Sequence, residues 1–208
     1  MALSTYTELK AAVIDQSHRD DLDLKIDDFI QLAETEARAN PDEPLNLRAS
    51  EVEVELSTVV DSSTVALPSG FSHARGLRIT VGGEKVRLTY REPSSMLYRS
   101  GSGEPFAYTV IANNIQFDIA TDAIYTVTLQ YLGDFPALTS AAPTNIVLTK
   151  YPNIYLFGCL KQANIYADDD EKALKYNLLF ADAIKSANIA EARGRYSDSP
   201  TIAVGWAP

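Results

Sequence analysis

The chain has 208 residues, of which 18 are Lys or Arg and 28 are Asp or Glu, so its formal net charge at pH 7 is −10. A single cysteine, Cys159, excludes an intramolecular disulfide framework and a zinc site built from several cysteines. The acidic balance argues against tight nucleic-acid binding, which needs a basic face. No apolar run approaches the roughly 18 residues of a membrane-spanning helix, and we expect no secretory signal at the N-terminus.

The negative charge is concentrated at the N-terminal end of the sequence. Residues 1–45 have a net charge of −7, residues 46–140 of −3 and residues 141–208 of zero. This acidity has two interpretations, either a solvated helical face or a surface that repels a passing polyanion. For the second interpretation, the candidate residues are Asp21, Asp23, Asp27 and Asp28.

Two helices are predicted before residue 45. The first covers residues 4–17, where Thr5 and Glu8 have the spacing of a capping box. The second covers residues 24–39 and ends before Pro41, because a residue that precedes proline avoids the helical region. The apolar residues of the second helix form one stripe, which consists of Ile26, Phe29, Ile30, Ala33 and Ala37.

Between residues 50 and 132 the apolar period changes from 3.6 to 2, which predicts about seven short strands. The stretch 51–56 alternates without a fault and indicates a half-buried strand. Gly82-Gly83 supplies the positive φ angles of a tight hairpin turn, followed by a strand over residues 86–90, and Asn113-Asn114 marks a second hairpin. A short helical turn is expected over residues 93–99. Strands at this spacing are typical of an antiparallel sandwich or barrel.

The C-terminal third is predicted to be helical again. Thr144 is expected to cap a short helix that runs to about residue 150, and Pro152 to open a longer helix through about residue 166. This longer helix is apolar all round, which is typical of a helix buried on every side. A last helix over about residues 169–191 follows an acidic cap, Asp168–Asp170. Its expected apolar stripe consists of Leu174, Leu178, Ala181 and Ile184.

Residues 194–208 are predicted to form an extended tail, with Gly194 ending the last helix. The tail carries apolar side chains that a solvated, disordered segment seldom has, so we expect it to dock on another protein. The candidate docking residues are Tyr196, Pro200, Ile202, Val204 and Trp206.

These elements predict an α+β fold in which helices from both chain ends bracket an all-β insert. The expected helical module comprises residues 1–45 and 141–193, because the apolar stripes of these helices are natural partners for one another. Residues 46–140 are expected to form the inserted antiparallel β-sandwich or barrel, and residues 194–208 the extended C-terminal docking tail.

No catalytic or metal-binding constellation stands out in the sequence. His18 and His73 lack a metal-ligand spacing, and the phosphate-loop and nucleophile-elbow motifs are absent. The acidic residues around Asp21 do not fit a calcium-binding EF-hand loop, and we interpret them as capping acids of the second helix. Cys159 lies on the most buried helix and is interpreted as an inert core thiol. We therefore predict no catalytic residue, no metal and no cofactor; a hydrolase that depends on His18 or His73 is a minor alternative.

The order of several segments carries a family resemblance. Residues 65–71 form a strand that ends in Leu-Pro, a small residue and then Phe, and residues 103–108 give a Pro-aromatic entry to a hairpin. Leu129–Leu132 follows, and then Tyr151–Gly158 with an acidic cap ten residues further on. In this order the segments resemble the adaptor, or head-to-tail connector, proteins of short-tailed bacteriophages. Cys159 departs from the family pattern, which usually has Ala there.

The resemblance implies a structural virion protein rather than an enzyme. Such a protein is expected to form a homo-oligomeric ring, with twelve copies, beneath the portal protein in the neck between head and tail. There it would extend the DNA channel without binding the passing DNA specifically and form the platform for the tail nozzle and tail-fibre proteins. It would assemble in the host cytoplasm, with no membrane partner, and its tail would reach the portal.

Tyrosine usage keeps a second function open. The chain has eleven Tyr against seven Phe and one Trp. Exposed aromatic rings on the β insert could stack on sugar rings, as in a carbohydrate- or receptor-binding β module of a tail structure, whereas ordinary strand packing would bury them. The second function predicts a sugar affinity that is lost when exposed Tyr residues are replaced, and no portal binding.

Overall fold

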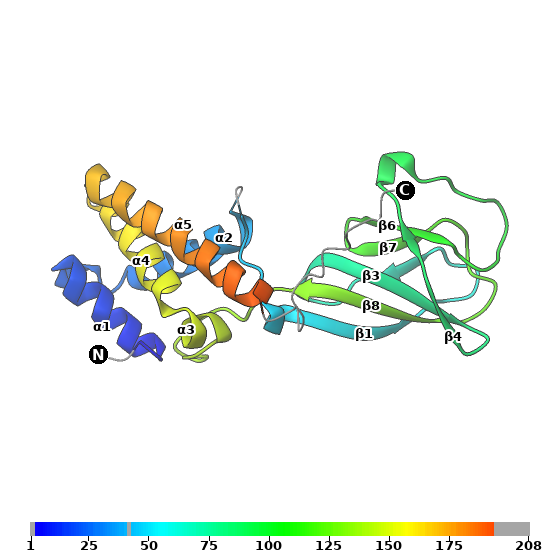
Figure 1. The fold of residues 1–208 in the computed structure, drawn as a ribbon, viewed down its shortest axis with the longest axis horizontal. Helices are drawn as coiled ribbons and strands as arrows, with labels where there is room; N and C mark the ends of the chain where they lie inside the picture. The colour runs from blue at the N-terminus through cyan, green and yellow to red at the C-terminus, as the bar shows by residue number, and fades with distance from the viewer. Residues whose placement is uncertain (1–2, 41–42, 194–208) are drawn as a thin grey trace, which may run out of the picture. The chain divides into compact units, whose positions relative to one another are not determined.

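The computed structural model describes residues 3–40 and 43–193 (Figure 1). The chain divides into two compact units, and the chain passes from one to the other twice. The helical unit consists of the described residues within Met1–Ala49 and Phe135–Pro208, and the β unit is Ser50–Asp134. Helices and two mainly antiparallel sheets make this an α+β protein, as predicted.

The described part of the helical unit contains five α-helices, and their ranges follow the predicted ones closely. The Thr5–Glu8 capping box at the start of the first helix is confirmed, with the Glu8 N–H 3.3 Å from the Thr5 hydroxyl oxygen and the Thr5 N–H 3.1 Å from a Glu8 carboxylate oxygen. The helices are α1 (Tyr6–Ser17), α2 (Ile26–Ala39), α3 (Ile146–Lys150), α4 (Pro152–Tyr166) and α5 (Asp170–Arg193), with 3-10 turns at Asp20–Leu22 and Arg48–Ser50.

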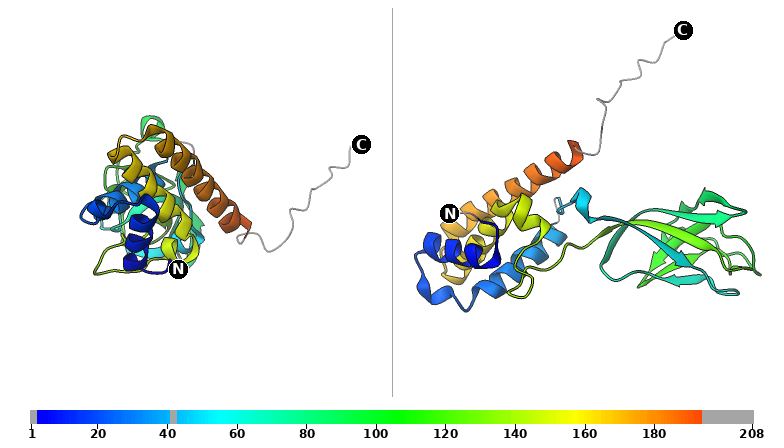
Figure 2. Two further views of the ribbon diagram at one scale, coloured as in Figure 1. Left: turned by 90° about the vertical axis from the view of Figure 1, so that its left-hand side faces the viewer. Right: turned by 90° about the horizontal axis from the view of Figure 1, so that it is seen from below.

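Helix α4 is the centre of this unit and packs against α1, α2 and α5 (Figures 1 and 2). The prediction that it is buried all round holds for most of its circumference, where seven of its fifteen residues are buried. It fails near the C-terminal end of the helix, where Ile165 and Tyr166 are exposed. The predicted stripe of α2 is also buried. Helix α4 lies very close to α2 and α5 at Gly158. A Cβ at this position would lie 2.7 Å from the Ala33 Cβ of α2 and 3.0 Å from a ring carbon of Phe180 of α5.

Two predictions for the C-terminal helices were wrong in detail. The cap of α3 is Asn145 rather than Thr144, since the Asn145 side chain accepts from the Leu148 N–H at 2.9 Å. On α5, Leu174 and Leu178 are 62% and 63% exposed instead of buried. The helix turns a different face to α4, whose buried apolar members are Ala173, Phe180, Ala183, Ile184 and Ala187. Residues on both faces recur at helical spacing, so periodicity alone cannot choose between them.

The β unit is a sandwich of two four-stranded sheets, in the orders β1-β8-β3-β4 and β2-β7-β6-β5. Side chains from both sheets form one hydrophobic core between them, with Leu77 and Leu129 from the first sheet and Ile115 and Phe117 from the second completely buried. The strands are β1 (Glu51–Ser57), β2 (Thr64–Ala66), β3 (Phe71–Val81), β4 (Glu84–Arg87), β5 (Thr89–Tyr90), β6 (Ala107–Ile111), β7 (Asn114–Phe117) and β8 (Thr126–Gly133).

The strand predicted over residues 86–90 divides at Leu88. Residues before Leu88 pair with β3 in the first sheet, and residues after it pair with β6 in the second. The β5–β6 pair is parallel, so the sandwich is not purely antiparallel. This change of sheet places Leu88 in the core and leaves β4 as a short edge strand.

The turns follow the sequence with one shift. Gly82 and Gly83 have φ angles of +59° and +88°, which confirms the predicted tight hairpin. The second hairpin turns at residues 112 and 113, one position earlier than predicted, because Ile111 pairs with Asn114. Ala112 therefore occupies the left-handed region, with φ +52°. The predicted turn near residue 93 is the 3-10 helix Pro93–Ser95.

Candidate interaction surfaces

The four predicted acidic residues lie at the corner of the helical unit where the chain turns into α2. Each forms an ion pair: Asp21 with Arg19 at 2.6 Å, Asp23 with Lys10 at 3.4 Å, Asp27 with Lys10 at 3.7 Å, and Asp28 with Lys25 at 3.8 Å. Their side chains are 58–65% exposed. The corner is therefore a solvent-facing mixture of charges with a small acidic excess, and not a bare acidic patch.

The interpretation of these residues as capping acids was wrong. The N-cap position of α2 is Lys25, and no side chain makes a capping hydrogen bond there. Asp27 and Asp28 lie in the first turn, where a negative charge interacts favourably with the helix dipole. Asp27 also accepts a short hydrogen bond from the Tyr6 hydroxyl, which ties α2 to α1. The hydrogen bond from Arg19 lowers the pKa of the Asp21 carboxyl, so this side chain stays charged.

A buried carboxylate that the sequence analysis missed, Glu34, fixes the segment that returns from the β unit. Glu34 is 4% exposed, and one of its oxygens accepts from the Leu138 N–H at 2.7 Å and from the Tyr155 hydroxyl at 2.6 Å. Its other oxygen lies 3.3 Å from Arg38, which also donates to the Phe135 carbonyl at 3.1 Å. Burial, and then the hydrogen bond to Glu34, raises the pKa of Tyr155, so this hydroxyl remains a donor.

Glu191 does the same for the segment that leads into the β unit. This residue is 6% exposed and accepts from the Arg48 N–H at 2.8 Å, the Tyr151 hydroxyl at 2.9 Å and Lys150 at 3.2 Å. One turn earlier on α5, Asn188 accepts from the Asn46 N–H at 2.8 Å. The sequence does contain a signal for the burial of both carboxylates. Glu34 and Glu191 each occupy a position, at helical spacing, that continues the buried apolar stripe of their helix.

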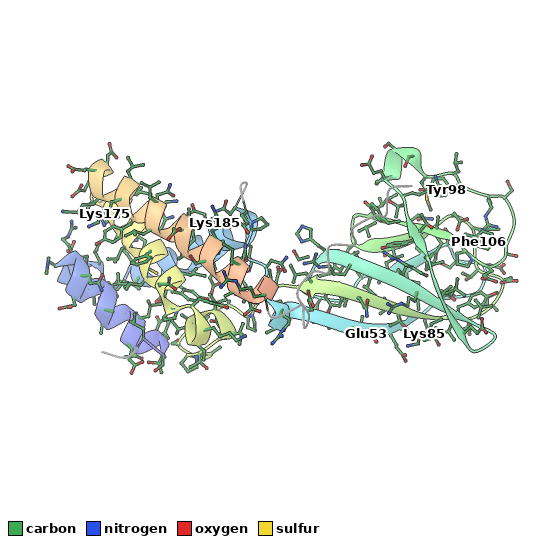
Figure 3. All side chains as sticks on the ribbon, viewed as in Figure 1. Glu53, Lys85, Tyr98, Phe106, Lys175 and Lys185 are labelled. Carbon is green, nitrogen blue, oxygen red and sulfur yellow. The ribbon has the colours of Figure 1, made fainter. Side chains whose placement is uncertain are left out.

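In the β unit, the buried carboxylate of Asp118 orders the long connection between β5 and β6. One oxygen accepts from the Arg99 side chain at 2.7 Å, and the other accepts from the N–H groups of Phe106 and Ala107 at 3.0 and 3.1 Å. The Arg99 guanidinium lies over the Phe106 ring, 4.4 Å from its centre. Three large side chains of this connection, Leu97, Tyr98 and Phe106, are exposed to solvent. Figure 3 labels Tyr98 and Phe106.

A cavity of about 480 Å³ in the β unit lies where β3 meets the second sheet. It is lined by residues 71–76 of β3, Arg87, Leu88, Tyr90, Tyr108 and Val110. Tyr90 is 51% exposed, whereas Tyr108 is buried beneath it, with the two rings edge to face at 5.5 Å between centres. We call this cavity the β3 groove.

The histidines and the cysteine show no active-site geometry. His18 is the C-cap of α1, and His73 belongs to β3 in the other unit, where its ring is 2.7 Å from the Ser72 hydroxyl. Burial raises the pKa of the Cys159 thiol, as expected for an inert core residue. Across residues 3–40 and 43–193, no cluster of three or more His, Cys, Asp or Glu side chains could hold a metal ion. In the same ranges no helix is both long and apolar enough to cross a membrane.

The predicted docking tail, including Tyr196, Pro200, Ile202, Val204 and Trp206, lies outside the described residues. A comparison with protein families nevertheless reaches into it, because the model of the SU10 adaptor protein family matches residues 4–204, across both units. The chain belongs to the SU10 adaptor protein family. The family resemblance inferred from the order of the segments is thereby confirmed. No curated protein matches the chain.

Membership of the SU10 adaptor protein family places the surfaces described above in a virion. The protein is a structural adaptor of a bacteriophage, it belongs to the neck of the virion, and it interacts with portal and tail components there.

Proposed function

We propose that this SU10 family adaptor is the subunit of a head-to-tail ring that docks on the portal, extends the DNA channel and forms the platform for the tail nozzle and fibres. The observation that carries the proposal is the family match over residues 4–204, which includes both units and most of the tail. The ring has twelve copies and takes part in tail assembly, genome packaging and genome ejection. Its subunits form in the host cytoplasm before they join the virion.

Two separate units support a role between two neighbours. Each unit has its own hydrophobic core, so each can present a surface without rearranging the other. The chain segments next to the β unit are fixed in the helical unit by Glu34 and Glu191. A repeated lateral contact between copies can be weak by itself, because a portal ring that binds every copy raises their effective concentration.

The tail is proposed to be the portal-docking element. Its apolar side chains, among them Ile202, Val204 and Trp206, support a docking role. The test is size-exclusion chromatography of the portal ring mixed with the full chain, with a chain ending at residue 193, and with the paired substitution Ile202→Ser and Trp206→Ser. Leu174→Ser with Leu178→Ser is a matched control for the loss of two large apolar side chains, since both are exposed on α5. Co-elution of the full chain and the control, with loss for the other two, is the expected result; co-elution of all four would contradict tail docking.

The acidic corner is proposed to face the DNA channel. Its side chains are exposed and its excess charge is negative, so repeated copies would repel DNA within about 8 Å in physiological salt. Asp27→Lys with Asp28→Lys should slow genome ejection, whereas the charge-matched control Glu171→Lys with Asp182→Lys, on the exposed face of α5, should not. Ejection at the wild-type rate in the first variant would refute the assignment.

The alternative is a carbohydrate- or receptor-binding β module, and it is supported by Tyr90 and Tyr98, which are 51% and 55% exposed. It requires that glycan binding be lost in Tyr90→Ser or Tyr98→Ser without any effect on portal binding. A glycan array probed with the wild-type protein and with both variants tests it directly.

A further inference from the structure

We infer that the β3 groove binds an extended, acidic segment of a neighbouring virion protein, which adds to the open edge of β3 as a further strand. The inference rests on the proposed function for the kind of partner, and on the geometry of the groove for the chemistry. Three features of the β unit support it: a strand edge without a partner strand, a set of basic side chains, and an apolar wall.

The first half of β3 has one edge without a strand partner. Residues 71–80 pair with β8 on one side, but β4 pairs on the other side only with residues 78–81. After Leu88, whose N–H donates to the Leu77 carbonyl at 2.9 Å, the chain leaves for the second sheet. Among the described residues, no strand therefore covers the outer edge of residues 71–76. Because of two register shifts, residues 71–76 face only four residues of β8, Gln130–Gly133, which corresponds to about 13 Å of strand. This is enough for about four residues of an added strand.

Edge strands are commonly blocked against unwanted pairing by charges or bulges. Here β3 has two bulges, one between Phe71 and His73 and one between Ala74 and Gly76, so the strand edge is bent. Such an edge disfavours pairing with an arbitrary strand and favours a partner that matches the bend.

The groove is basic although the protein is acidic. Of the described residues that line it, His73, Arg75 and Arg87 are basic and none is acidic. Arg87 lies directly opposite Arg78 in the β3–β4 pair, an arrangement that is unfavourable without a counter-charge. In the described residues no carboxylate pairs with Arg87, whereas Lys85, two positions earlier on β4, lies 3.8 Å from Glu55. A carboxylate of an incoming segment would supply the missing counter-charge for Arg87.

The groove also has an apolar wall. Tyr90 and the buried Tyr108 pack edge to face, and Leu88 and Val110 continue the wall. A wall of this kind suits the alternating apolar side chains of a strand. The volume of about 480 Å³ is within the range of ordinary ligand pockets. The segment that fits best therefore alternates apolar and acidic residues.

Selection from a random dodecapeptide library displayed on messenger RNA tests the inference with the isolated full chain. We expect the selected peptides to alternate Asp or Glu with apolar residues. Their affinity should fall at least about tenfold in Arg87→Glu, because the substitution replaces an attraction between opposite charges with a repulsion between like charges. The charge-matched control is Lys85→Glu, which lies on the same strand outside the groove and should change the affinity less than about twofold. Amide hydrogen exchange of residues 71–76 should slow when the peptide binds.

Several results would overturn the inference. The first is that the selected peptides are not enriched in Asp or Glu. The second is that they bind Arg87→Glu as tightly as the wild type. The third is that amide hydrogen exchange of residues 71–76 is unchanged when a peptide binds. Peptides that bind only after residues 194–208 are removed would identify the tail of this chain as the occupant instead, and self-association that is lost in Arg87→Glu would identify a second copy. A failed selection with intact portal binding would refute the groove assignment alone, whereas failed portal binding would refute the proposed function.

Discussion

A methyl group added at Gly158 tests the packing at the centre of the helical unit. In an exposed helix, Gly→Ala stabilises by about 1 kcal/mol, because alanine loses less backbone entropy on folding. At residue 158 the new Cβ would lie 2.7 Å from the Ala33 Cβ, well inside the contact distance of about 3.5–4.0 Å, and 3.0 Å from the Phe180 ring. Helix α4 is packed by α1, α2 and α5, so it cannot simply move away.

The expected effect of Gly158→Ala is therefore a net loss of stability. Overpacking a well-filled core costs about 1–3 kcal/mol, which equals or exceeds the propensity gain of about 1 kcal/mol and leaves a destabilisation of up to about 2 kcal/mol. Ala33→Gly removes the closer of the two clashes, while the end of the Phe180 ring can shift. In that background Gly158→Ala should become neutral or stabilising by up to about 1 kcal/mol, a coupling of roughly 2 kcal/mol between the two sites.

Urea unfolding followed by circular dichroism at the helix wavelength measures these free energies, since all five described α-helices belong to the helical unit. Ala181→Gly, on the exposed face of α5, gives the propensity effect without a change of packing. If Gly158→Ala stabilises the wild-type protein, or has the same effect with and without Ala33→Gly, the close approach of α2 and α4 is not as described.

Three further predictions concern single residues. Glu34→Ala leaves the Leu138 N–H and the Tyr155 hydroxyl without an acceptor, so calorimetry should show a loss of about 3 kcal/mol in the free energy of unfolding. Glu34→Gln keeps an oxygen that can accept and should lose less. Equal losses in the two variants would contradict this role of Glu34. Burial alone would raise the pKa of Glu191, but hydrogen bonds, chiefly from the Arg48 N–H, lower it below the ordinary 4.5. The stabilising effect of the Glu191 carboxylate is thus complete above its pKa in the unfolded chain and is lost as the pH falls through its pKa in the folded protein. Urea titrations at decreasing pH should show that the stability of Glu191→Gln depends less on acid than that of the wild type. The same acid dependence in both proteins would count against this role of Glu191. Ala112→Gly should raise the thermal midpoint by relieving a left-handed φ of +52°, with a gain of up to about 1 kcal/mol, and a lower midpoint would argue against the turn geometry.

Local patterns were sufficient to predict most elements of the fold. The Thr5–Glu8 capping box, the helix that opens at Pro152 and the Gly82-Gly83 hairpin each depend on residues close in sequence, and each appears as predicted. Such features follow from backbone geometry and capping, which distant parts of the chain rarely override. The family assignment likewise used the order of local segments.

The errors occurred where packing partners decide the outcome. Two faces of α5 carry apolar residues at helical spacing, and only the position of α4 selects Ile184 for the core and leaves Leu178 in solvent. The change of sheet at Leu88 depends on β6, which the chain reaches more than fifteen residues later. The buried carboxylate of Glu34 is predictable only as an exception within an apolar stripe, because its partners near Leu138 are about a hundred residues away.

The interaction surfaces were the least predictable part. Asp21 and Asp28 are exposed, as expected for a surface role, but their ion pairs with Arg19 and Lys25 reduce the charge that they present. The β3 groove has no signal in the sequence, because it arises from two bulges and a strand crossing in three dimensions.

The mass of the complex with the portal ring of the same phage decides the adaptor role. Native mass spectrometry of the portal ring, alone and with an excess of this protein, would give the number of bound copies. The proposed function predicts a discrete complex with twelve copies on one portal ring and no partly filled rings at saturation. A portal ring whose mass does not change would contradict the docking of this adaptor on the portal.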